Sequence, residues 1–321
     1  MRRFWTTALC LLALCVEARA QSDWPNRPIK IIVSQAAGAA PDIVCRYLAD
    51  WLSAGIGQQF IIENRPGGQN TIGAQAAARS AADGYTLFFA TTAALATNPH
   101  TFKSLPYDPL RDFTPVSMVA KGPFFLMAHP SVPGSTLKEV IAADKADPGK
   151  LSIATEGPRQ FTGILAGWLN KKAGTKFLEV PYANVPAGVQ DALAGRVQLI
   201  SMAIAPAAPF ISSGQLKALA VSSPTTMQNF PGIPPISDTV PGMSLVGWFV
   251  LVAPTGTPEP AVTRLNQEMA KVLARSEVRR RLLDFGVYTD GAGSVTETGK
   301  FIHDEYALWQ QALRDIGLEP Q

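Results

Sequence analysis

The alternation of short apolar segments with helix-patterned segments is the feature that most constrains the fold of this chain. Residues 28–33 form a compact β-branched run typical of a buried strand, and apolar side chains recur at helical spacing over residues 42–52. Residues 60–63, 71–82 and 85–90 continue the order as strand, helix and strand. This order and spacing predict a βαβαβ unit built on a parallel sheet.

The same alternation begins again after residue 123. Further strands are expected over residues 124–128, 151–154, 177–180, 197–200 and 216–221, and helices over residues 136–146, 163–173 and 185–194. A long apolar strand follows over residues 246–252, and helices are expected over residues 260–275, 276–285 and 295–316. Two such sets, with the chain returning to the first, predict an α/β fold of two lobes. A ligand cleft is expected between the lobes, at the carboxyl ends of the strands.

The first twenty residues have the pattern of a secretory signal peptide. Arg2 and Arg3 precede an apolar core over residues 9–16, and Ala18-Arg19-Ala20 gives the small-x-small pattern of a cleavage site. The alternative is a retained membrane anchor, but the apolar run is shorter than the roughly 20 residues that span a bilayer. We therefore predict that residues 1–20 are a cleaved signal peptide.

The charge of the mature chain argues against a polyanionic partner. Residues 1–20 contain three basic residues and one acidic residue, so the 28 Lys and Arg and the 25 Asp and Glu become 25 and 24 after cleavage. A nearly neutral protein has no strong attraction for nucleic acid or an anionic membrane surface. Of the three cysteines only Cys45 lies beyond the signal peptide, which excludes an internal disulfide.

A series of short motifs runs in one order through the mature chain. The segments are residues 28–42 (PIKIIVSQAAGAAPD), 63–68 (ENRPGG), 83–87 (DGYTL), 105–113 (LPYDPLRDF), 129–133 (HPSVP), 147–151 (DPGKL), 217–221 (KALAV) and 253–258 (APTGTP). In these motifs the chain resembles the extracytoplasmic receptors of tripartite tricarboxylate transporters, also called the Bordetella uptake gene receptors. Any one motif is weak, but the collinear set covers essentially the whole mature chain.

The resemblance implies a periplasmic-binding-protein fold of the Venus-flytrap kind (type II) in the periplasm of a Gram-negative bacterium. It implies a monomer that binds a small organic acid, without cofactor or metal, and delivers it to a permease with a large and a small membrane subunit. Lobe 1 is expected to be discontinuous, comprising residues 21–122 and 247–321, and lobe 2 to comprise residues 123–246. The hinge is expected near residues 121–124 and 244–246.

The loop after the first strand is the first candidate ligand site. Its small residues include Ala37, Gly38, Ala39 and Ala40, which let a ligand approach the backbone closely. The following helix N-terminus offers unpaired N–H groups and a partial positive charge, which suit a carboxylate. The alternative is a tight turn without a ligand. Asp42 is expected to cap the helix, to organise water in the site as the resemblance suggests, or to do both.

The corresponding loop of the second lobe is the other candidate. This loop supplies the predicted ligand residues Thr155, Gly157, Arg159, Gln160, Phe161 and Thr162. Residues at the ends of other strands complete the predicted set: Thr91, Met202 and Ala203. Glu156, Arg159 and Phe161 depart from the small or polar residues usual in the resembled family. Arg159 is expected either to pair with a second ligand carboxylate or to be solvated or paired with Glu156.

Phe161 and Met202 suggest the chemical character of the ligand between its acidic ends. Both suit an aromatic or aliphatic body and favour a dicarboxylate with such a body, although both are equally typical of a core. Trp248 and Phe249, on the strand that returns to the first lobe, are expected to pack in the core rather than to contact ligand.

No motif supports catalysis. The HExxH, paired CxxC, GxSxG, P-loop and full GxGxxG patterns are all missing from the sequence, and no carboxylate pair stands out by spacing. We therefore predict no catalytic residues and a binding protein rather than an enzyme. The alternatives are a receptor of the same fold that feeds a membrane sensor kinase and, less favoured, a secreted hydrolase.

Overall fold

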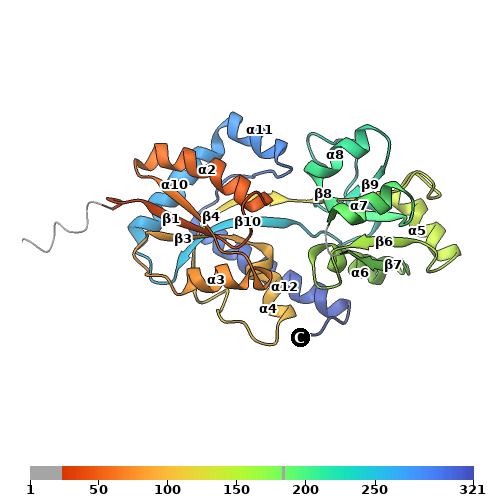
Figure 1. Cartoon of the computed structure of the whole chain (residues 1–321), viewed down its shortest axis with the longest axis horizontal. Coiled ribbons are helices and arrows are strands. Elements are labelled where there is room, and N and C mark those ends of the chain that lie inside the picture. The colour runs from red at the N-terminus through yellow and green to blue at the C-terminus, as the bar shows by residue number, and fades with distance from the viewer. Residues whose placement is uncertain (1–23, 183–184) are drawn as a thin grey trace, which may run out of the picture.

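Two separate sheets divide the protein into two lobes that lie side by side in Figure 1. The computed structural model describes residues 24–182 and 185–321, and the predicted signal peptide lies outside them. Within these residues ten strands form two five-stranded sheets, each covered by helices on both faces. The predicted two-lobed α/β fold is therefore confirmed.

The first sheet has the strand order β2-β1-β3-β10-β4. Strands β1 (Ile29–Val33), β2 (Phe60–Asn64) and β3 (Thr86–Thr91) are parallel, as the βαβαβ pattern predicts. Strand β10 (Gly247–Pro254) returns from the second lobe and pairs antiparallel with both β3 and β4 (Phe113–Gly122). The first sheet is therefore mixed, and segments far apart in the sequence build it.

The second sheet repeats this arrangement in the order β7-β6-β8-β5-β9. Strands β6 (Ser152–Thr155), β7 (Leu178–Pro181) and β8 (Leu199–Ala203) are parallel, and β5 (Phe124–Ala128) pairs antiparallel with both β8 and β9 (Lys217–Val221). In each lobe the carboxyl ends of the parallel strands point toward the other lobe (Figure 1).

The helices form layers on the two faces of each sheet. On the first sheet, one face carries α2 (Ala40–Ile56), α10 (Glu259–Ala274) and α11 (Ser276–Asp284). The other face carries α3 (Thr71–Ala78), the π-helical turn η3 (Ala93–Thr97), α4 (Asn98–Thr101) and α12 (Val295–Asp315), and the short 3₁₀ turn η2 (Gly68–Asn70) precedes α3. On the second sheet, α5 (Leu137–Ala146), α6 (Phe161–Ala173) and α9 (Ile236–Thr239) cover one face, and α7 (Val185–Leu193) and α8 (Ile204–Ser212) cover the other.

Strand β4 and helix α8 were not expected from the sequence, and both contain proline. Pro115 lies within β4, where proline is tolerated because β4 is the edge strand of its sheet. Pro209 lies inside α8, a position at which proline removes a backbone hydrogen bond. Because proline is disfavoured inside strands and helices, the sequence did not predict these two elements.

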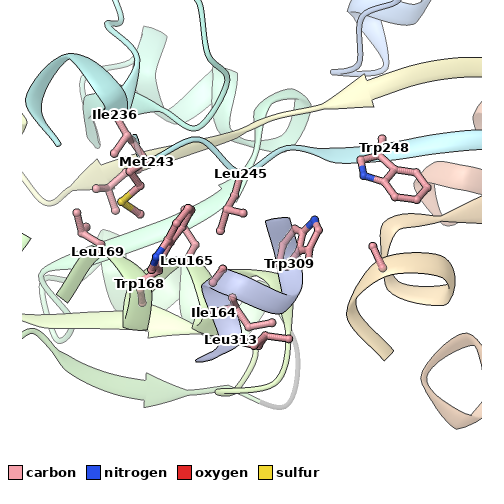
Figure 2. Close-up of a cluster of buried hydrophobic side chains, with 14 of the residues drawn as sticks. Ile164, Leu165, Trp168, Leu169, Ile236, Met243, Leu245, Trp248, Trp309 and Leu313 are labelled. Carbon is pink, nitrogen blue, oxygen red and sulfur yellow. The ribbon is translucent and has the colours of Figure 1, made fainter. Parts of the chain in front are cut away.

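Of the three apolar clusters among the described residues, one runs through both lobes by way of α12. Trp309 of α12 is fully buried and belongs to the same cluster as Trp248 of the first lobe and Ile164 of α6. Figure 2 shows Trp309 lying between the α6 side chains and Trp248. Nε1 of Trp168, also on α6, donates to Oδ2 of Asp315 at 3.1 Å. The C-terminal half of α12 therefore packs on the second lobe although the rest of the helix packs on the first.

The chain also crosses between the lobes as two strand connections. Strands β4 and β5 are separated only by Pro123, and β10 begins at Gly247, which pairs with Gly122. These crossings lie at the expected hinge segments. Because α12 contacts both lobes, the division into residues 21–122 with 247–321 and residues 123–246 stays a proposal. Within residues 24–182 and 185–321, no helix is long and apolar enough to span a bilayer.

Replacing Trp309 with Ala should weaken the connection between the lobes. The fully buried indole would leave a cavity in the shared core, so we expect the free energy of unfolding to fall by about 3–5 kcal/mol. Urea denaturation of the two proteins measures this difference. His303→Ala, at an exposed position of the same helix, is the control and should change stability by less than about 0.5 kcal/mol. A loss for Trp309→Ala no larger than the control's would contradict the shared core.

Candidate ligand-binding cleft

A cavity of about 600 Å³ lies between the lobes. Nine of the predicted site residues line it: Ala39, Ala40, Thr91, Arg159, Gln160, Phe161, Thr162, Met202 and Ala203. Five others, Ala37, Gly38, Asp42, Thr155 and Gly157, do not line it. The cavity therefore brings together parts of both predicted loops, one from each lobe.

Asp42 braces the first loop from behind the cavity wall. It is 2 % exposed, and its carboxylate accepts hydrogen bonds from the backbone N–H of Gly38 at 2.8 Å, from Asn64 Nδ2 at 2.8 Å and from Arg46 Nε at 3.1 Å. Burial raises the pKa of Asp42, but these hydrogen bonds outweigh it and hold the pKa below its ordinary value. Asp42 lies in the first turn of α2 and not at its N-cap, so the capping interpretation is wrong.

The first turn of α2 is the candidate carboxylate-binding element of the first lobe. Its N-cap residue Ala39 has no side-chain acceptor to satisfy the first N–H groups, and Ala39, Ala40 and Pro41 all line the cavity. The N-terminus of a 17-residue helix carries a partial positive charge. A ligand carboxylate can therefore bind there without a cationic side chain.

Side-chain amides that the sequence did not single out line the wall beside α2. They are Gln35, Gln69, Asn70 and Asn98. Gln69 and Asn70 have φ values of 52° and 78°, and they are the only non-glycine residues with positive φ in the described part of the chain. Left-handed backbone at such residues is strained and is concentrated at functional sites. Asn98 Nδ2 holds this turn by donating to the carbonyl of Gln69 at 2.6 Å.

The second loop is held by threonine hydroxyls. Thr155 Oγ1 donates to Glu179 Oε1 at 2.7 Å and accepts from the N–H of Gly157 at 3.1 Å. Thr162 Oγ1 accepts from the N–H of Glu156 at 2.8 Å. Thr155 and Gly157 thus shape the loop, whereas Glu156 and Thr162 reach the cavity wall.

Arg159 is bound to the first lobe rather than to Glu156. Its Nη1 donates to the backbone carbonyl of Glu319 at 2.7 Å and to that of Thr101 at 3.4 Å. The C-terminal tail is itself tied to this segment, because the N–H of Gln321 donates to the carbonyl of Thr101 at 3.1 Å. The expected pair with Glu156 is therefore wrong, because Arg159 binds main-chain carbonyls instead.

An aromatic pair forms part of the wall. Phe161 stacks on Phe124 with ring centroids 4.2 Å apart and an interplanar angle of 19°. Met202 also borders the cavity but is 3 % exposed and packs in the core of the second lobe. Trp248 and Phe249, expected in the core, border the cavity too, although Trp248 is 1 % exposed and donates from Nε1 to Glu305.

Apart from Glu156 and Arg159, the described residues that line the cavity are uncharged. The lining contains no histidine, cysteine or lysine among the described residues. Over the same residues, no group of three or more His, Cys, Asp or Glu side chains is placed to hold a metal ion. Ser201 Oγ is buried on the cavity wall, and no described residue is hydrogen bonded to it. The arrangement is suited to binding a small polar molecule.

Comparison with known proteins decides the family. The model of the tripartite tricarboxylate transporter family receptor matches residues 44–318. The chain belongs to this receptor family. A UPF0065 protein of Bordetella bronchiseptica is 31 % identical to the receptor over 310 residues, which cover 97 % of this chain and 92 % of the relative.

Solved structures of the same fold agree with this assignment. An R. palustris protein solved with adipate has a TM-score of 0.81 and 29 % identity to the receptor, covering 93 % of this chain and all of that one. The periplasmic binding protein BugD has a TM-score of 0.76 and 26 % identity, with 93 % and 100 % covered. The receptor therefore shares the two-lobed fold of periplasmic solute-binding proteins.

Replacing Asp42 with Asn should destabilise the receptor and weaken its ligand binding. The asparagine amide would face the same three donors with one acceptor oxygen instead of two. We therefore expect the free energy of unfolding to fall by about 1–3 kcal/mol at neutral pH. Because the folded pKa of Asp42 lies below its ordinary value, this stabilisation is present above the ordinary pKa and is lost as the pH falls through the folded pKa.

The stability of both proteins is measured by denaturation between pH 7 and pH 3. The difference between Asp42→Asn and the parent should shrink at the acid end. Asp50→Asn, at an exposed position of α2, is the control and should behave as the parent does. A constant difference across the pH range would show that the charge of Asp42 does not brace the loop.

Replacing Arg159 with Ala tests the bond between the lobes. Since Arg159 Nη1 donates to main-chain carbonyls of the first lobe, we expect a monocarboxylate and the dicarboxylate of equal length to lose affinity equally, by about three- to tenfold. Isothermal titration calorimetry measures both dissociation constants. Arg159→Lys retains a donor and should lose less. A much larger loss for the dicarboxylate would instead place Arg159 on its second carboxylate.

Proposed function

We propose that this receptor captures a small organic acid in the periplasm and delivers it to a tripartite tricarboxylate-type membrane transporter. The observation that carries the proposal is the start of α2, which enters the cleft wall without a side-chain cap and opposite the second lobe. An uncapped helix N-terminus supplies N–H donors and positive potential to a carboxylate. The adipate found in the R. palustris relative supports an acid ligand.

The delivery step follows from movement of the lobes. A ligand that contacts both walls of the cleft favours the closed arrangement in proportion to its extra contacts there. The strand crossings at residues 122–124 and 244–247 provide the short connections about which the lobes would rotate. In the proposed cycle, the large and small permease subunits recognise the closed receptor, a monomer whose signal peptide, residues 1–20, has been removed.

The cleft suggests what kind of acid is carried. The stacked Phe124 and Phe161 rings support a ligand with an apolar body, in line with the sequence. The aromatic or aliphatic dicarboxylate favoured from the sequence needs a partner for its second carboxylate. Arg159 is already hydrogen bonded to the first lobe, so it is not a free cationic partner for that second carboxylate. The other charged lining residue, Glu156, is negative and would repel it.

The test is a thermal-shift screen of residues 21–321 against aliphatic and aromatic mono- and dicarboxylates, tricarboxylates and amino acids. A ligand that binds only the folded state stabilises it by about 2.7 kcal/mol at 100 times its dissociation constant, so an acid that binds should raise the melting temperature clearly. No shift with any acid would contradict the proposal.

A matched pair of variants locates the binding. Ala39→Glu places a carboxylate at the N-terminus of α2, where it would compete with that of the ligand, so the shift should disappear while the protein stays folded. Ala54→Glu, at an exposed position of the same helix, should leave the shift unchanged. If Ala39→Glu binds as the parent does, the acid binds elsewhere.

A further inference from the structure

The two walls of the cleft differ in charge. Among the described lining residues, only Glu156 and Arg159 carry charged side chains. Arg159 donates to the carbonyls of Glu319 and Thr101 and forms no ion pair with Glu156. The first lobe presents the start of α2, and the second presents the Glu156 carboxylate and an Arg159 guanidinium already hydrogen bonded to the first lobe.

Glu156 is held in a defined place at the end of β6. Its backbone N–H donates to Thr162 Oγ1 at 2.8 Å, and the preceding Thr155 is fixed by Glu179 and by the N–H of Gly157. The loop is thus tied on both sides of Glu156. The carboxyl group is therefore presented to the cavity by a braced backbone rather than by a free loop.

No cation neutralises this carboxylate within the described part of the chain. None of the ion pairs there includes Glu156. Burial raises the pKa of Glu156, and the hydroxyl of Thr162 offsets only part of this increase. Glu156 is exposed to the open cleft, and a carboxylate without a cationic partner there is stabilised when a ligand donates hydrogen bonds to it.

A second polar group lies close by in the same wall. Strands β6 and β8 are parallel with Ala154 beside Ile200, so the chain continues at that edge of the sheet as Thr155 and Ser201. Ser201 is 5 % exposed and lines the cavity, and its buried side-chain Oγ has no hydrogen-bond partner among the described residues. The second lobe thus contributes to the lining the Glu156 carboxyl group, which accepts hydrogen bonds, and Ser201, whose hydroxyl can accept or donate.

We propose that Glu156 determines the specificity of the cleft by selecting an organic acid whose other end carries N–H donors, as a primary amide or an ammonium group. This inference rests on the proposed function, since it assigns the ligand carboxylate to the first turn of α2. A dicarboxylate of the same length would place its second negative charge against Glu156, and such like-charge contact is strongly unfavourable. Glu156 therefore both attracts the N–H ligand and repels the dianion.

The test uses matched ligands of four, five and six carbons, with adipate, adipamate and 6-aminohexanoate as the longest set. Each set contains the dicarboxylate, its monoamide and the corresponding ω-amino acid. Calorimetric titration of the parent protein should give at least one N–H ligand that binds about tenfold or more tightly than its dicarboxylate. A preference for the ω-amino acid identifies an ammonium ligand, and a preference for the monoamide identifies a neutral amide.

The variant Glu156→Gln separates specificity from folding. Its amide retains size and can donate to a carboxylate, so the dicarboxylate should gain affinity, the N–H ligand should lose it, and the ratio should fall by about tenfold or more. Glu277→Gln, at an exposed position of α11, should leave the ratio unchanged. The melting temperature without ligand checks that both variants fold.

The outcomes distinguish this inference from the proposed function. If no acid in the wide screen binds the parent, the proposed function fails, and this inference fails with it. If acids bind but the dicarboxylates bind as tightly as their N–H counterparts, or the ratio is the same in Glu156→Gln, this inference alone is overturned. It is also overturned if the wide screen finds an acid while every N–H ligand of the matched sets fails to bind.

Discussion

The packing of α12 against both lobes is the constraint on which the cleft depends. A cleft between two sheets has a defined width only if the sheets are held at a defined distance, and two strand crossings beside paired glycines do not fix it alone. Trp309 and its neighbours bury apolar surface from the first lobe and from α6 in one cluster. Apolar burial is the main favourable term in folding. The burial of Trp309 therefore stabilises the fold and holds the two walls of the cleft together at the same time.

Most of the described residues that line the cleft are uncharged. A helix N-terminus, amides, hydroxyls and an aromatic pair line the cavity, while the one lining arginine is bound to the backbone of the other lobe. Recognition of an anion by oriented dipoles avoids the desolvation of a buried cationic side chain. In the proposed binding mode the carboxylate of Glu156 has a large influence on specificity, because no ion pair among the described residues includes it.

The sequence predicted the parts of this protein that are governed by local pattern. The βαβαβ order, the loop before α2 and the second loop at residues 155–162 follow from periodicity and turn residues, or from the family motifs. Strand β4 was not predicted, because Pro115 interrupts its strand-like residue pattern and because β4 lies at the edge of the sheet. The partner of Arg159 could not be foreseen, because Glu319 lies 160 residues away and contributes a main-chain carbonyl that no motif marks. Asp42 was identified as important, but its three donors come from a loop, a helix and a separate strand.

The shared acceptor of two tryptophans has a practical consequence. Trp248 borders the cleft, and its Nε1 donates to Glu305 Oε2 at 2.7 Å; Trp309 donates to the same oxygen at 3.2 Å from within the core that joins the lobes. Indole emission responds to the polarity and charge around the ring. The molecule thus carries two indoles that share one acceptor, one bordering the cleft and one at the junction of the lobes. Occupancy of the cleft can be followed optically without attaching a dye.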